Sequence, residues 1–326
     1  MLFLFLLKNN IPIFAAVLLG YLCSHFHILG KRATGVLTDF VFFVSLPCMV
    51  LYQFSKHSID TIFNGSYMAV IAVASLTLAA LGMLVGKKIF KQRLSESALT
   101  LMSISQVNTA YLAIPIFLLF FKTVAPVVLV SVFQQLVISS LVLGMIEYDL
   151  YKSAKKVGFT HLLFLKEIPK ALLKTPIIMA SFVGLVFSYN HLSFPSPIGY
   201  FLDLMGTSAA PLSLFVLGLS LQQDKISFRN GEFKQQIFTL LFLKNLFHPL
   251  LAFCLGKFVF HLSPFWLVTA TLMAAMPTAR NSALFAQRYG LDVQRANTLI
   301  VLSTFTAFVM INLILYLSGD VSALAG

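Results

Sequence analysis

Residues Ser105–Phe121 read SQVNTAYLAIPIFLLFF, and this stretch decides how the rest of the chain is interpreted. It is apolar enough to lie in a membrane, yet Gln106 and Asn108 precede Tyr111, and Pro115 follows it. Proline removes a backbone donor and blocks the helical hydrogen bond to the residue four positions earlier. In hydrocarbon the freed carbonyl group must find another partner. We therefore expect an interrupted membrane helix with polar groups at the interruption.

The composition of the 326 residues is that of a membrane protein, since 59% are hydrophobic and only 10% are charged. A soluble domain carries roughly 25% charged residues. The alternating pattern of a β-barrel is missing from the sequence. The cysteines Cys23, Cys48 and Cys254 fall within apolar segments and are interpreted as small hydrophobic residues. We expect no metal and no cofactor.

Ten apolar segments approach the roughly 20 residues that a membrane-spanning helix requires. They are 10–28, 35–55, 65–88, 97–120, 125–146, 173–191, 198–221, 235–259, 264–287 and 294–317. The sequence therefore predicts an all-α integral membrane protein with ten transmembrane helices.

The basic residues indicate how these segments are oriented. With the N-terminus outside, most of the 23 lysines and arginines fall in inner loops. Only Lys8, Lys56, Lys122 and Lys257 fall on the outer side. Cytoplasmic loops are enriched in Lys and Arg, so we expect a multi-pass protein of the cell inner membrane with both termini outside. The net charge of +12 is assigned to loops that face anionic lipid, and not to nucleic acid.

The chain also repeats itself. Four residues recur in the same order and at one constant offset: Pro12, Gly20, His27 and Pro47 return as Pro176, Gly184, His191 and Pro211. The pattern predicts a first five-helix repeat at 1–150, a basic cytoplasmic linker at 151–172 and a second repeat at 173–326. Because five is odd, the second repeat enters the membrane inverted. Secondary transporters often have this plan, with the binding site where broken helices meet near the midplane.

Pro115 in the fourth segment and Pro277 in the ninth are pseudo-symmetric in this repeat. If both helices break at these prolines, they cross and expose backbone groups to a central cavity, where helix N-termini favour an anion. An ordinary proline kink is the alternative. Asn281 and Arg280 directly follow Pro277. Arg280 either pairs with a carboxylate substrate or extends to the inner membrane surface.

Gln134, in the fifth segment, either contacts substrate or hydrogen-bonds to a neighbouring helix. The predicted substrate-binding residues are Asn108, Tyr111, Pro115, Gln134, Pro277, Arg280 and Asn281.

Lys244 and His248 share one face of the eighth segment. Lys244 is a candidate for charge balance or for a charge that moves during coupling. His248 either titrates in a proton-coupled mechanism or is a hydrogen-bonded core residue. The centres of the predicted spans hold no carboxylate, so the internal cations Lys244 and Arg280 favour an anionic substrate. The sequence contains no enzyme signature, and we expect no catalytic residue.

The chain resembles the auxin efflux carrier family in four motifs: NTAYLAIP at 108–115, AAPLSLFVLGLSL at 209–221, KNLFHP at 244–249 and MPTARNSALFAQRYG at 276–290. The resemblance covers essentially the whole chain. Bacterial members of this family are known as malate or malonate permeases, and plant members export auxin. Ala110 and Ala113 depart from the family, which often has glycine at these positions.

This resemblance implies a ten-span fold related to the sodium/bile acid symporters, in which the fourth and ninth spans cross at proline breaks. It places Asn108 and Pro115 at the first crossing point, and Pro277 and Asn281 at the second. It further implies that spans one, two, six and seven form a scaffold, against which the other spans move like an elevator.

We therefore expect a secondary active transporter of a small organic anion, such as malate, malonate or an auxin-like acid, that works by elevator-type alternating access. Two alternatives stay open: a sodium-coupled symporter of the bile-acid type, and a membrane sensor that binds the anion without moving it. The expected partners are the anion and the lipid bilayer. Coupling to protons or sodium, and a homodimer, also stay open.

Overall fold

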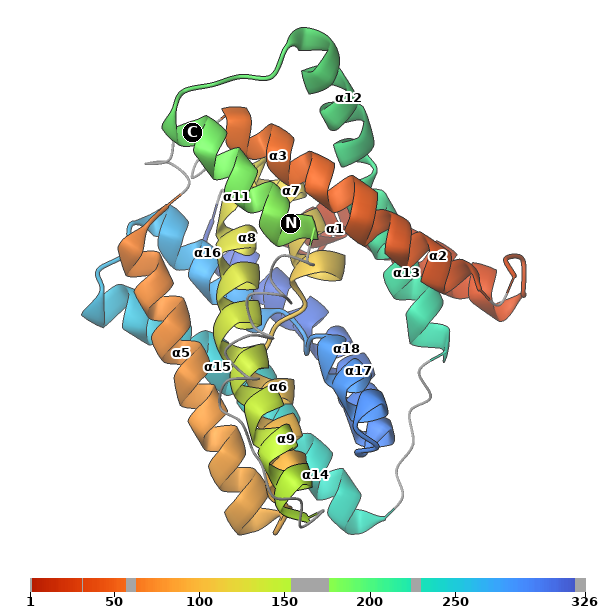
Figure 1. Ribbon diagram of the computed structural model, residues 1–326, viewed down its shortest axis with the longest axis vertical. Coiled ribbons are helices and arrows are strands. Elements are labelled where there is room, and N and C mark those ends of the chain that lie inside the picture. The colour runs from red at the N-terminus through yellow and green to blue at the C-terminus, as the bar shows by residue number, and fades with distance from the viewer. Residues whose placement is uncertain (1, 31, 57–62, 154–175, 224–229, 320–326) are drawn as a thin grey trace.

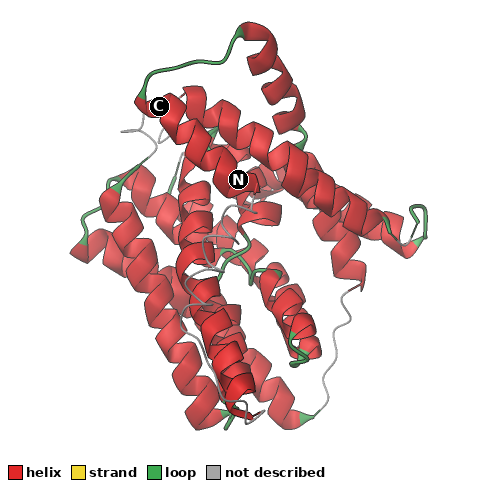
Figure 2. Ribbon diagram, viewed as in Figure 1, coloured by secondary structure: helices red, strands yellow, loops and turns green. Residues whose placement is uncertain are grey.

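The computed structural model describes residues 2–30, 32–56, 63–153, 176–223 and 230–319, with side chains from Ile11 onward. Within these ranges the secondary structure is helical, which confirms the all-α prediction for the part of the chain described (Figure 2). One isolated antiparallel bridge joins Val107 to Thr278. The predicted linker at 151–172 lies outside the described residues after Ser153.

Six helices in the described ranges are long and apolar enough to cross a membrane: Ala33–Lys56, Gly65–Ile89, Ala125–Lys152, Ser196–Gln222, Gly231–Val259 and Val293–Leu317. Shorter apolar helices fall on the other predicted segments: Ile11–His25, Thr109–Phe121, Pro176–Tyr189 and Pro264–Ala275. The protein is therefore a multi-pass membrane protein.

Many of these helices contain a π-helical turn, marked η. The first half consists of α1 (Leu2–His25), α2 (Ala33–Phe40), η1 (Val41–Ser45), α3 (Leu46–Lys56), α5 (Gly65–Leu84), η2 (Val85–Ile89), α6 (Leu94–Ser105), η3 (Thr109–Ala113), α7 (Ile114–Phe121), α8 (Ala125–Phe133), η4 (Gln134–Ser139) and α9 (Ser140–Ser153).

The second half consists of α11 (Pro176–Tyr189), α12 (Ser196–Thr207), α13 (Ala209–Gln223), α14 (Gly231–Leu241), η5 (Phe242–Phe247), α15 (His248–Cys254), η6 (Leu255–Val259), α16 (Pro264–Ala275), α17 (Asn281–Arg288) and α18 (Val293–Leu317). Single π turns inside α-helices often occur at functional sites. Tyr111, Gln134 and Lys244, all predicted from the sequence, lie in such turns.

The helices form two groups in space (Figure 1). In the upper group, α1 packs on α13, and α3 packs on α11 and α12. In the lower group, α5 packs on α6, α15 and α16, and α6 packs on α9. The two groups meet where η3 and α7 contact α13. Segments from both halves of the sequence therefore contribute to each group.

Glycine sets the spacing between α1 and α13. A Cβ atom at Gly218 would overlap the carbonyl oxygen of Val17, and one at Gly20 would overlap the carbonyl oxygen of Phe215. Small residues allow membrane helices to approach until their backbones touch. No larger side chain fits at either glycine unless the helices separate, so the spacing of this pair is fixed by the backbone.

Local backbone geometry recurs in the two halves. His27 and His191, which correspond in the sequence repeat, both follow a helix and both have positive φ, at 56° and 51°. Asn64 and Asn230 cap α5 and α14 in the same way, each accepting a hydrogen bond of 2.8 Å from the amide three residues later. Asn is among the preferred residues for such caps. Corresponding helices of the two halves therefore share local features: an Asn cap before α5 and α14, and a residue with positive φ after α1 and α11.

Candidate binding site at the helix crossing

Two helices, α6 and α16, end abruptly inside the molecule. α6 ends at Ser105 and α16 ends at Ala275, and the next residue of each is extended. Gln106 has φ −87° and ψ 143°, and Met276 has φ −59° and ψ 147°. The last carbonyl groups of an interrupted helix lack helical partners, so both ends require other hydrogen bonds.

The two interruptions supply these bonds to each other. Val107 pairs with Thr278 in the antiparallel bridge, and the amide of Asn108 donates to the carbonyl of Pro277 over 2.8 Å. The hydroxyl of Thr278 donates to the carbonyl of Ser103, near the end of α6, also over 2.8 Å. The helices therefore cross at their interruptions and are joined there by hydrogen bonds.

Pro115 does not lie at an interruption, and this part of the prediction is wrong. Pro115 occupies the first turn of α7, which continues from η3 without a gap. The helix is interrupted earlier, at Gln106–Asn108, and restarts at Thr109. The π turn ahead of Pro115 is wider than an α turn, which accommodates the proline ring without breaking the helix. Pro277, in contrast, lies in the interruption itself.

The amide side chains of Gln106 and Gln134 connect this crossing to η4. Gln106 Nε2 donates to Ser139 Oγ over 2.8 Å and to the main-chain oxygen of Gln134 over 3.3 Å. Gln134 Oε1 accepts a hydrogen bond of 3.3 Å from the amide of Val107. Asn108 caps η3, because its Oδ1 accepts from the amide of Tyr111 over 3.1 Å. Each amide side chain is therefore held in place by at least one contact.

The other end of each amide side chain is buried without a protein partner. Within the described residues, these atoms are Gln106 Oε1, Asn108 Nδ2 and Gln134 Nε2. A buried polar atom without a hydrogen bond costs about 1–3 kcal/mol, and native proteins contain few of them. Several such atoms gathered at one place indicate a site that binds a polar ligand.

A cavity of about 110 Å³ lies at the crossing. Five of the seven predicted substrate-binding residues line it: Asn108, Tyr111, Gln134, Arg280 and Asn281. Pro115 and Pro277 do not line it, although the carbonyl of Pro277 holds the amide of Asn108 in place.

Arg280 contributes the positive charge in the cavity wall. It immediately precedes α17, and it is partly buried. Tyr111 lies within electrostatic range of both Arg280 and Asp39, and beside Thr38. Asp39 lies on α2, near the start of the predicted span 35–55, and was not among the predicted site residues. No local pattern signals its approach to Tyr111, since the two residues lie far apart in the sequence.

Apolar side chains of other helices also line the cavity. They are Phe42 of η1 and Ile177 and Ile178 of α11. An apolar residue in an apolar span carries no signal of its position, so these residues could not be predicted from the sequence. The cavity therefore has both polar and apolar lining residues, and α11 of the upper group contributes to it.

Lys244 and His248 are fully buried and lie outside the cavity lining. Lys244 Nζ is 3.4 Å from His248 Nδ1, so the two side chains contact each other. Asn245, between them in sequence, donates from Nδ2 to the carbonyl of Ser303 over 3.1 Å. The hydroxyl oxygen of Ser303 in turn accepts from the amide of Thr278 over 3.1 Å. Asn245, the sequence neighbour of Lys244, is thereby linked to the crossing through one residue of α18.

Comparison with known proteins adds an independent finding. A family model described as "Membrane transport protein" matches residues 5–316. The chain is 23% identical to a "Putative malonate transporter" of Rhizobium meliloti over 309 residues, which cover 94% of each chain. It is 25% identical to an "Uncharacterized transporter" of Methanocaldococcus jannaschii over 300 residues, which cover 90% of this chain and 93% of the relative.

Proposed function

The chain belongs to the membrane transport protein family, and from this membership we propose that it is a secondary active transporter of a small organic anion. The same match confirms the resemblance to the auxin efflux carriers that the motifs indicated. The relative named as a malonate transporter, similar along its whole length, supports a carboxylate as substrate.

The observation that carries the proposal is the chemistry of the cavity at the crossing. Asn108 Nδ2 and Gln134 Nε2 are buried there without protein partners within the described residues, and Arg280 lines the same cavity. Two amide donors and a guanidinium group are complementary to a carboxylate, which only accepts hydrogen bonds. Hydrogen bonds to an ionised group are about twice as strong as neutral ones, which offsets the desolvation of a small anion.

The size of the cavity favours a short substrate. Pockets for drug-sized ligands have volumes of about 300–1,000 Å³, whereas this cavity has about 110 Å³. A dicarboxylate of three or four carbons, such as malonate or malate, therefore suits it better than an auxin-like acid with an aromatic ring. Apolar Phe42 and Ile178 face the short carbon chain in this arrangement.

We further propose ten spans arranged as two inverted repeats that work as an elevator. The hydrogen-bonded crossing belongs to the lower helix group, while α11 and η1 of the upper group close the cavity with apolar side chains. If the lower group slides along this apolar wall, the cavity opens first to one side of the membrane and then to the other. The recurring helix ends at His27 and His191 support the duplication.

In this mechanism Lys244 and His248 provide the coupling. The two side chains contact each other, and their sequence neighbour Asn245 bonds to Ser303, which holds the amide of Thr278 at the crossing, so a proton gained or lost at the pair changes the charge on the helix that carries Asn245. Sodium coupling is the alternative, and it predicts that transport requires a sodium gradient. A proton-coupled carrier instead responds to a pH gradient in sodium-free buffer.

The direct test is uptake of labelled malonate and malate into proteoliposomes that contain the purified protein. We expect saturable uptake, and counterflow when the vesicles are preloaded with unlabelled acid. A protein that binds malonate in a thermal-shift assay but shows no counterflow is a sensor. Neither binding nor transport of any short carboxylate, with the fold intact, would overturn the proposal.

A further inference from the structure

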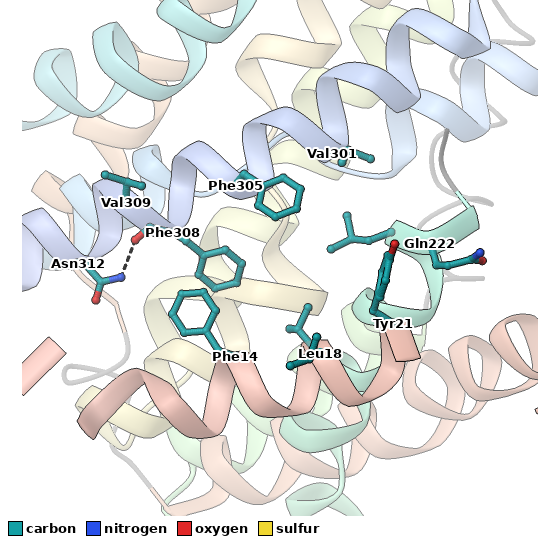
Figure 3. A pocket seen from close by; sticks show the side chains of 11 residues that line it. Phe14, Leu18, Tyr21, Gln222, Val301, Phe305, Phe308, Val309 and Asn312 are labelled. Carbon is teal, nitrogen blue, oxygen red and sulfur yellow. Dashed lines mark hydrogen bonds between the residues drawn. The ribbon is translucent and has the colours of Figure 1, made fainter. Parts of the chain in front are cut away.

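A second cavity in the described part of the chain is larger than the one at the crossing. It has a volume of about 690 Å³ and lies between α1, the end of α13 and α18. Figure 3 shows its walls, with Phe14, Leu18 and Tyr21 on one side and the Val301–Asn312 segment of α18 on the other. Apart from Tyr21, Gln222 and Asn312, its lining is hydrocarbon.

An aromatic pair joins α1 to α18 in the wall of this cavity. The rings of Phe14 and Phe308 lie 4.6 Å apart, and both residues line the cavity. α13 lies against α1 at Gly20 and Gly218. Two helices that are held together by their backbones thus form a firm wall, and α18 forms the opposite side.

The cavity opens to the surroundings of the protein. Leu18, Phe305 and Val309 line it and are 56%, 59% and 68% exposed. In a membrane protein an open apolar cavity within a span is in contact with lipid chains and not with water. Lipid tails pack against such surfaces without having to lose water first.

The depth of the cavity matches one leaflet of a bilayer. It extends from Tyr21 and Gln222, close to the ends of α1 and α13, to Phe14 in the middle of α1. Along α18 it covers Val301–Asn312, which is about 16 Å at 1.5 Å per residue. The hydrocarbon core of a bilayer is about 30 Å thick, so one leaflet is about half of this.

A second, polar cavity adjoins the first at the end of α1. Its volume is about 330 Å³, and its lining includes Ser24, His27, Thr34 and Gln222. Gln222 lines both cavities, and its Oε1 accepts a hydrogen bond of 3.0 Å from Ser24 Oγ at the junction. The apolar cavity, at the depth of the hydrocarbon core, and the polar cavity, at the membrane surface, therefore adjoin each other along one side of the protein.

A basic residue adjoins the lining of the polar cavity in the sequence. Arg32, which is exposed, directly precedes Ala33 in its wall, and the lining described for either cavity contains no Asp or Glu. Basic side chains at the membrane surface attract anionic headgroups. We propose that the two adjoining cavities bind one anionic phospholipid, with an acyl chain beside α18 and the phosphate next to Ser24 and His27. This proposal requires only that the protein lies in a membrane, so it does not depend on transport.

Native mass spectrometry of detergent-purified protein, offered equal amounts of phosphatidylglycerol and phosphatidylcholine, tests this site. We expect one phosphatidylglycerol retained per chain in preference to phosphatidylcholine. Leu18→Trp fills the apolar cavity and is expected to lower this retention about tenfold, since the acyl chain loses its contacts. The matched control is Leu76→Trp, at an exposed position of α5, which lines neither cavity and is expected to retain the lipid.

Arg32→Gln tests the headgroup independently, because it changes an exposed residue and not the packing. We expect the preference for phosphatidylglycerol to be lost in Arg32→Gln and kept in Lys88→Gln, an exposed cation elsewhere. Equal retention of both lipids by the unchanged protein would overturn the proposal, as would equal retention by Leu18→Trp and Leu76→Trp. A second copy of the chain as occupant, seen as a dimer that Leu18→Trp dissociates, would also overturn it. If Leu18→Trp does not fold, an unchanged preference in Arg32→Gln decides against the site.

Discussion

Two helix contacts in this molecule are built in opposite ways. α1 meets α13 through glycines that lie against the partner's backbone, whereas α6 meets α16 through hydrogen bonds between interrupted backbones. The first contact leaves no room for a methyl group at Gly218. The second borders a cavity and carries buried amide atoms without protein partners in the described ranges. The contact that fixes the helix spacing and the contact that borders the candidate binding cavity are therefore at different places in the molecule.

Stability and function therefore rest on different residues of this molecule. A contact made of backbone and glycine can be broken only by added volume, and breaking it affects the whole fold. A contact made of polar groups can be changed one hydrogen bond or one charge at a time.

Gly218→Ala is expected to have the largest effect. The added Cβ meets the carbonyl oxygen of Val17 and the amide of Tyr21, which are backbone atoms and cannot rotate away. We expect a loss of stability of about 3 kcal/mol or more, since overpacking a closely packed site costs 1–3 kcal/mol even where side chains give way. Gly35→Ala, in α2 with open space around it, is the control and should melt at or slightly above the wild-type temperature. A wild-type melting temperature for Gly218→Ala would contradict the fixed spacing.

Arg280→Gln is expected to lower malonate uptake by roughly 10- to 100-fold. A hydrogen bond to a charged group contributes about 1.5–3 kcal/mol, and each 1.4 kcal/mol is a factor of ten. Arg288→Gln, at the exposed end of the same helix α17, is the control for charge alone. The assay is initial uptake into proteoliposomes. Equal loss in both variants would mean that Arg280 acts only through the net charge of the helix.

Asn108→Asp is expected to lower uptake by about tenfold while the helix cap is kept. Either side chain offers an oxygen to the amide of Tyr111, but aspartate replaces the free amide donor with a negative charge that repels an anion. Asn64→Asp makes the same change at the cap of α5, outside the cavity, and should transport normally. If the two variants transport equally well, Asn108 does not contact the substrate.

Thr278→Val is expected to have the smallest effect, a loss of about 1–3 kcal/mol in stability. It removes the hydroxyl that donates to the carbonyl of Ser103, which lies in the last turn of α6 and lacks a helical partner. Thr304→Val removes a hydroxyl that donates to Ile300 within its own helix, and we expect it to cost less. Thermal melting in one detergent compares the two. Equal losses of stability in the two variants would show that the hydrogen bond across the crossing contributes no more than a hydrogen bond within one helix.

The helices could be predicted from composition, because a span of about 20 apolar residues has few other stable conformations in hydrocarbon. The position of the interruption could not. The prolines suggested that Pro115 corresponds to Pro277, but a π turn accommodates Pro115, and it is Val107 that pairs with Thr278. Whether a proline breaks a helix depends on the turn before it, which the sequence pattern does not specify.

The candidate site was predictable where it contains polar side chains in apolar surroundings. Asn108, Gln134 and Arg280 stand out for this reason, and all three line the cavity. Phe42 and Ile178 could not be found, because their place in the cavity wall comes from packing between helices far apart in the chain. Lys244 and His248 were identified as a pair, yet the link from their neighbour Asn245 to the crossing through Ser303 emerges only from the folded structure.

The bond between Thr278 and Ser103 joins residues 175 positions apart, and this separation has a consequence for how the protein is made. A chain that is synthesised from its N-terminus inserts α6 long before Thr278 leaves the ribosome. Until then the carbonyl of Ser103 and the amide of Asn108 lack the partners that they have in the finished protein. Contacts of such high sequence separation form late and slowly. During biogenesis the first half is therefore incomplete. Until the second half is inserted, it has polar backbone groups at membrane depth without their final partners.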